Sequence, residues 1–74
     1  MSKEFGIMLR KCREARGLSP ATVDEYLGIM RGSCVNWENG FAVPEKELLE
    51  ELAGYYHVPF SVLLDAMREH TPAK

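Results

Sequence analysis

Gly17-Leu18-Ser19-Pro20 is followed along the chain by Gly28 and then by Trp37-Glu38-Asn39-Gly40, and these stretches decide how the middle of the molecule folds. Glycine closes helices in the left-handed conformation, and serine followed by proline starts one, because proline fits the first helical position. The stretches therefore predict a helix that ends at Gly17, a short helix capped by Ser19, and another short helix before Gly40. Two short helices joined by a tight glycine turn form a helix-turn-helix, a frame that presents one helix to a nucleic-acid groove.

Apolar residues recur at helical spacing throughout the chain, and no segment alternates apolar and polar residues as a strand would. The spacing predicts five helices: Glu4–Arg16, Pro20–Leu27, Arg31–Glu38, one from near Pro44 to about Tyr56, and one from Val58-Pro59 onward. The side chains predicted to face inward are Phe5, Met8, Leu9, Cys12, Ala15, Val23, Tyr26, Leu27, Met30, Cys34, Trp37, Leu48, Leu49, Leu52, Ala53, Tyr56, Phe60, Leu63, Leu64 and Met67. We expect one all-α domain over residues 1–68, with Ser2 as its first cap, and a frayed tail over residues 69–74.

Charge is distributed unevenly along the 74 residues, whose net charge is -2. Residues 1–37 carry six basic and four acidic side chains, whereas residues 38–74 carry three basic and seven acidic ones. The half that holds the helix-turn-helix is therefore the basic half. The acidic half does little harm to nucleic-acid binding where it lies more than a Debye length, about 8 Å, from the groove.

The sequence gives little support to catalysis or metal binding. Cys12 and Cys34 are too far apart for a metal knuckle, and both fall at apolar positions of helical patterns, which predicts reduced core thiols. His57 and His70 have no partners at catalytic or metal-ligand spacing. The glutamates at residues 45, 47, 50 and 51 form a solvated helix face. We therefore expect no enzyme activity, no metal and no cofactor.

The sequence shows no sign of a membrane span or an export signal. No apolar run approaches the roughly 20 residues of a membrane span, and no charged-then-apolar signal peptide opens the sequence. We expect a soluble, cytoplasmic protein. A chain this short buries only about 60% of its unfolded surface, so that dimerisation is a natural source of further stability.

The residues that carry a family resemblance run through the motif and beyond it: Leu9, Arg13, Gly17-Leu18-Ser19, Val23, Leu27-Gly28, Trp37-Glu38-Asn39-Gly40, Pro44, Leu52-Ala53, Val58 and Leu63-Leu64. With this ordered set, the stretch from Phe5 to Leu64 resembles the Cro/C1-type helix-turn-helix family, also called the XRE family. The resemblance implies a compact, five-helix, lambda-repressor-like domain. It also implies a sequence-specific DNA-binding regulator of transcription, a homodimer that reads the major groove of double-stranded DNA with its third helix.

The resemblance also implies roles for individual residues. The outward positions of the third helix, which read bases in the family, are here Arg31, Gly32, Val35 and Asn36. Arginine can bond a guanine edge, asparagine an adenine edge, and valine can contact a thymine methyl group, while glycine lets the backbone come close. The positions of Arg13 and Glu38 form an ion pair in the family that joins the first helix to the end of the third. The alternative for Arg31 and Asn36 is an ordinary solvated position.

Two further groups of residues are candidates for contacts with DNA phosphates and with a second copy. The phosphate candidates are Arg10 on the outer side of the first helix, Ser33 near the start of the third, and Asn39 at its end; the alternative for each is a solvated polar residue. The expected dimer face lies on the fifth helix, because Val62 lies off its core stripe, and consists of Phe60, Val62, Ala66 and Met67.

Four features depart from the family pattern. Pro20 stands where a phosphate-binding glutamine is common, and Met30 stands where serine or threonine usually caps the third helix. Asp24 stands where alanine usually packs, so its carboxylate must tilt outward or find a donor, since a buried lone carboxylate is costly. The loop Phe41-Ala42-Val43 carries no charge, although this loop is usually basic.

These departures favour an alternative function of a different class. Val35 beside Phe41 and Val43 would form an exposed apolar surface, which is more typical of a contact with another protein. The domain would then be a protein-interaction module, such as an antirepressor or a partner of a regulator or polymerase. A loop that folds back and buries Phe41 would remove this surface.

Overall fold

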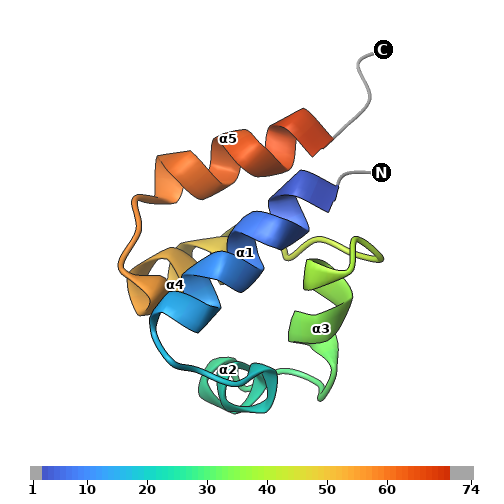
Figure 1. The fold of residues 1–74 in the computed structure, drawn as a ribbon, viewed down its shortest axis with the longest axis vertical. Coiled ribbons are helices and arrows are strands. Elements are labelled where there is room, and N and C mark those ends of the chain that lie inside the picture. Colours follow the sequence, from blue (N-terminus) through green and yellow to red (C-terminus); the bar gives the residue numbers. More distant parts are fainter. Residues whose placement is uncertain (1–2, 71–74) are drawn as a thin grey trace.

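A computed structural model describes residues 3–70, and Figure 1 shows the helices arranged around α1, which crosses the middle of the molecule. The described chain forms α1 (Lys3–Ala15), α2 (Pro20–Leu27), α3 (Ser33–Glu38), α4 (Lys46–Tyr56) and α5 (Phe60–His70). Helix α1 packs against α3 and α5, α4 packs against α5, and α2 packs against α3. The all-α fold predicted from the sequence is confirmed, and residues 3–70 contain no strand.

The ends of α2 follow from its own sequence. Ser19 Oγ accepts a hydrogen bond from the Thr22 backbone N–H at 3.2 Å, and Pro20 occupies the first helical position. Gly28 closes the helix in the left-handed conformation, with φ at 69°. The predicted cap and the predicted end of this helix are therefore both confirmed.

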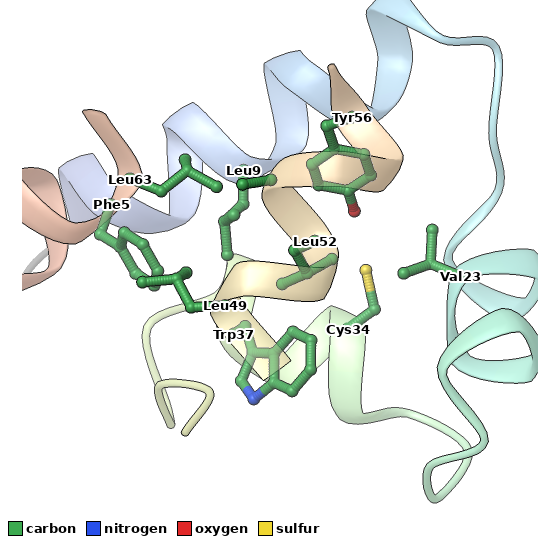
Figure 2. Close-up of a cluster of buried hydrophobic side chains, with 10 residues drawn as sticks. Phe5, Leu9, Val23, Cys34, Trp37, Leu49, Leu52, Tyr56 and Leu63 are labelled. Carbon is green, nitrogen blue, oxygen red and sulfur yellow. The ribbon is translucent and has the colours of Figure 1, made fainter. Parts of the chain in front are cut away.

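The core lies at the centre of the molecule, where Leu49, Leu52 and Tyr56 of α4 pack among Phe5 and Leu9 of α1 (Figure 2). All five described helices contribute at least one buried apolar side chain, so no helix completes its buried face alone. The buried set is Phe5, Leu9, Val23, Cys34, Trp37, Leu49, Leu52, Ala53, Tyr56 and Leu63.

Three residues that the helical spacing assigned to the core are exposed: Ala15, Tyr26 and Met30. Ala15 is the last residue of α1, and Met30 precedes α3 instead of lying in it, which leaves it 81% exposed. Tyr26 stacks its ring on that of Tyr55, with centroids 3.8 Å apart and planes 3° from parallel, and remains 60% exposed. The prediction was wrong for Ala15 and Met30 because helical periodicity does not fix a face at or beyond the end of a helix, and wrong for Tyr26 because its ring lies flat against Tyr55 at the surface.

Helix α1 crosses the carboxyl end of α3 at Gly6, which is buried. A Cβ atom at this position would overlap the carbonyl oxygen of Glu38 and lie 2.9 Å from that of Trp37. Only a hydrogen atom fits there, so Gly6 sets how closely the two helices approach. The sequence does not predict this role of Gly6, because a glycine inside an amphipathic helix carries no periodic signal.

Two predictions concern the ends of the chain. Helix α5 continues through His70, two residues beyond the expected domain boundary at residue 68. The expected cap Ser2 and the remainder of the expected tail, residues 71–74, lie outside the described residues. Within residues 3–70, no helix combines the length and the apolar character that a membrane span requires.

Candidate nucleic-acid interface

Helix α3 has one buried face and one open face. Cys34 and Trp37 point into the core, whereas Val35 is 41% exposed and Asn36 is exposed. Arg31 is also exposed, but it lies in the turn before α3. No segment among the described residues covers this face, so it is accessible to a macromolecule.

The third helix begins at Ser33, two residues later than its predicted start at Arg31. The reason is Gly32, which adopts a left-handed conformation with φ at 94° and serves as the N-cap. Arg31 and Gly32 therefore precede the helix, and only Val35 and Asn36 of the four base-reading candidates lie on it. The expectation that Met30 occupies the cap position is also wrong.

The amino end of α3 is capped by Asp24, a residue of α2. Its carboxylate accepts hydrogen bonds from the backbone N–H of Gly32 at 2.8 Å and of Cys34 at 3.0 Å. Asp24 is 3% exposed and each of its carboxylate oxygens accepts a hydrogen bond, so of the two outcomes expected for Asp24, the structure shows the one in which it finds donors. The N–H of Ser33 donates to the Met30 carbonyl at 3.1 Å.

These bonds bear on the phosphate candidates. The N–H groups of Gly32, Ser33 and Cys34 already have acceptors within the protein, and the hydroxyl of Ser33 donates to the Met30 carbonyl at 2.7 Å. A hydroxyl has one proton to donate, so Ser33 has none left for a phosphate in this conformation. Arg10 is exposed and pairs with Glu14 at 3.2 Å, and Asn39 is exposed at the end of α3.

Arg13 and Glu38 join α1 to the end of α3 in the structure. The Arg13 guanidinium donates from Nε to Glu38 Oε2 at 2.7 Å and from Nη2 to Glu38 Oε1 at 3.0 Å. Its Nη1 donates to the Leu18 carbonyl at 2.8 Å, which ties in the turn before α2. The hydrogen bond to Glu38 raises the pKa of Arg13, so the guanidinium keeps its positive charge. Two-pronged geometry of this kind is the strongest form of the arginine–carboxylate interaction.

The thiol of Cys34 lies on the buried face of α3 and donates to Glu38 Oε2 at 3.3 Å. Burial, with the nearby Glu38 carboxylate as a second cause, raises the pKa of Cys34 to about 12. Burial also raises the pKa of Tyr56, whose hydroxyl points toward the sulfur of Cys34 (Figure 2). Because thiolates are the reactive form of cysteine, this thiol is chemically inert at neutral pH.

The loop after α3 exposes its apolar side chains. Phe41 is 78% exposed and Val43 is 41% exposed, so the alternative in which the loop folds back and buries Phe41 is wrong. The backbone N–H of Phe41 donates to the Asn36 carbonyl at 2.9 Å, which turns the chain directly after the helix. Pro44 is buried and anchors the far end of the loop.

The candidate dimer residues on α5 differ in accessibility. Phe60, Ala66 and Met67 are half-buried against the core of their own chain, whereas Val62 is 45% exposed. Val62 is therefore the most exposed of the four and the most accessible to a second copy. Within the described residues, no group of three or more His, Cys, Asp or Glu side chains could hold a metal ion.

The geometry defines a class of protein: an all-α domain in which α2, a glycine turn and α3 form a helix-turn-helix with an open third helix. The helix-turn-helix family profile matches residues 9–63, and the chain belongs to this family, in its Cro/C1-type branch.

A comparison with curated proteins adds a relative. The chain is 35% identical over 60 residues to the SPbeta prophage-derived uncharacterized HTH-type transcriptional regulator YonR of Bacillus subtilis (strain 168). The match covers 81% of the chain and 56% of that relative, so the chain spans little more than half of the relative's length. No solved structure matches the chain.

Proposed function

We propose that this domain binds double-stranded DNA as a sequence-specific regulator of transcription, with α3 entering the major groove. The observation that carries the proposal is the open face of α3, where Arg31 and Asn36 are exposed and uncovered by the described chain. Membership of the helix-turn-helix family supports it, as does the description of the relative as a transcriptional regulator.

Base reading falls to the residues on and just before α3. Arg31 is long enough to form a bidentate bond with a guanine edge from the turn, and Asn36 offers the matching pair for adenine. Val35 contacts a thymine methyl group, and each good polar pair discriminates by about 1–3 kcal/mol against a wrong base. Gly32 acts through the backbone, by allowing the turn that brings Arg31 forward. Arg10 and Asn39 supply phosphate contacts.

The proposed active species is a homodimer. Val62 on α5, with the half-buried Phe60, Ala66 and Met67 around it, forms the contact between the two copies. Two-fold symmetry then places the third helices on half-sites about one turn of DNA apart.

The alternative function, a protein-interaction module, rests on a different observation. Val35, Phe41 and Val43 leave an apolar surface on and after α3, and the loop that carries two of them has no charge to offer a phosphate. A partner protein with an apolar face would bind there, and Arg31 would then have no part in DNA recognition.

Selection of bound duplexes from a random pool at about 50 mM salt decides between the two. The DNA-binding proposal expects an enriched sequence and binding that weakens steeply with added salt. Arg31→Ala should lower the affinity for the selected duplex about 5- to 150-fold and relax one base position, which corresponds to the loss of one bidentate contact. Arg68→Ala is the matched control, because it removes the same charge from α5, which packs against α1 and α4. No binding at micromolar DNA would favour the protein-interaction module.

A further inference from the structure

The amino end of α3 is held by a residue of another helix. Helix α3 has only six residues, and its N-cap is Gly32, which has no side chain to bond the free N–H groups. The Asp24 carboxylate serves as the cap instead: one oxygen accepts a hydrogen bond from the N–H of Gly32, and the other accepts one from the N–H of Cys34. Helices this short are unstable alone, so the direction of α3 depends on what holds its ends.

Both ends of α3 are connected to other helices through carboxylates. Asp24 on α2 holds the start, and Glu38 at the other end is held by Arg13 of α1. The backbone carbonyl of Asp24 also accepts the N–H of Ile29 at 3.1 Å, so one residue binds both sides of the turn between α2 and α3. Arg31 lies inside that turn, directly before the N–H group that Asp24 holds.

We propose that Asp24 is a positioning residue for base reading, which fixes the angle of α3 and the direction of Arg31 without touching DNA. The inference rests on the proposed function. Its physical basis is that bidentate contacts to bases tolerate little displacement, while contacts to phosphates tolerate more. Loss of Asp24 should therefore reduce specificity more than general affinity for DNA.

Positioning by Asp24 and simple electrostatics predict opposite effects when the charge of Asp24 is removed. A carboxylate beside the proposed interface repels phosphates, so removing it by electrostatics alone would strengthen binding to any duplex. Glu25 is the matched comparison, because it is the next residue of α2 and exposed. Glu25 carries the same charge as Asp24. Among the described residues, it accepts none of the hydrogen bonds from the N–H groups at the start of α3.

The experiment compares wild type, Asp24→Asn and Glu25→Gln on two probes: the duplex recovered from the random pool and a scrambled duplex of the same composition. An asparagine oxygen can accept one of the two N–H bonds, but its NH₂ group faces the other donor. Asp24→Asn should lower the ratio of the two affinities about tenfold or more, as expected for one displaced bidentate contact. Glu25→Gln should change both affinities alike and leave that ratio unaltered.

A ratio for Asp24→Asn that matches wild type overturns the inference and leaves the proposed function standing. If wild type itself shows no preference between the duplexes, the base-reading role is overturned together with the proposed function. Amide hydrogen exchange needs no DNA, so in that case it still tests whether Asp24 holds the start of α3. The Gly32 and Cys34 amides should be protected in wild type, and at least one of them should exchange about tenfold faster in Asp24→Asn, while Leu52 in the core is unchanged. Unprotected Gly32 and Cys34 amides in wild type overturn the positioning role even if the variant does not fold.

Discussion

Replacing Gly6 by alanine tests the closest helix crossing in the structure. The added Cβ would overlap the Glu38 carbonyl oxygen and lie 2.8 Å from the Glu38 carbonyl carbon and 2.9 Å from the Trp37 oxygen. All three are backbone atoms, which no rotamer change can move. Helix α1 must therefore withdraw from α3, and the contacts around the Arg13–Glu38 pair must loosen with it.

Two opposing terms set the magnitude. Overpacking of this kind costs about 1–3 kcal/mol, and backbone partners place this case at the upper end. Alanine in place of a helical glycine returns about 1 kcal/mol through its higher helix propensity. The net loss is about 2 kcal/mol. The whole domain of 74 residues is held folded by roughly 0.05–0.15 kcal/mol per residue, so this loss is a large share of its stability. For a domain of this size the loss corresponds to a fall in Tm of about 8–16 °C.

Gly54→Ala is the matched control, because it makes the same change inside α4. Gly54 is exposed, and a Cβ there would meet nothing within 4 Å. Only the propensity gain remains, so this variant should be more stable than wild type by about 0.5–1 kcal/mol. Thermal and urea unfolding of both variants measures the difference. A Gly6→Ala protein that melts at or above the wild-type temperature would show that α1 and α3 do not cross this closely.

Three other predictions follow from buried and strained groups. Arg13→Met should cost about 3–5 kcal/mol in urea unfolding because it strands the Glu38 carboxylate, and Arg13→Met with Glu38→Leu should cost less than the single change; equal or additive losses would contradict this. Stability should fall as pH rises from about 8.5, where an unfolded thiol ionises, toward about 12, where Cys34 ionises in the folded protein, because only the unfolded state releases the proton in that window. Cys34→Ala should flatten part of this slope, and Ellman's reagent at neutral pH should label native Cys12, which is half-buried, faster than Cys34. His57→Gly should raise the free energy of unfolding by about 0.5–1 kcal/mol, because His57 ends α4 in the left-handed conformation at φ 62°; a lower Tm would show that its 3.5 Å contact with Arg16 matters more than the strain.

Sequence reasoning succeeded where the determinant is local. Ser19, Pro20 and Gly28 fix the ends of α2 through bonds and φ angles within a few residues, and the structure confirms them. The buried faces of α4 and of most of α1 follow from apolar spacing, because a helix places residues three and four apart on one side. The sequence left open whether Phe41 is exposed or buried by a loop that folds back, and the structure shows it exposed.

The candidate site shows the limit of the same reasoning. The chemistry of Arg31 and Asn36 is evident from their residue types, but the start of α3 is not. Its cap comes from Asp24, eight residues before Gly32 and on a different helix, so no inspection of the residues next to α3 could reveal it.

The order of residues along this chain was enough to set five helices, a helix-turn-helix and the half of the domain that carries positive charge. Only the packed molecule decided where α3 begins, how its start is capped and how near α1 comes at Gly6. The division has a physical cause. Helix propensity, capping by neighbours and periodicity act over one or two turns, whereas a buried carboxylate and a backbone-to-backbone crossing exist only once distant segments meet.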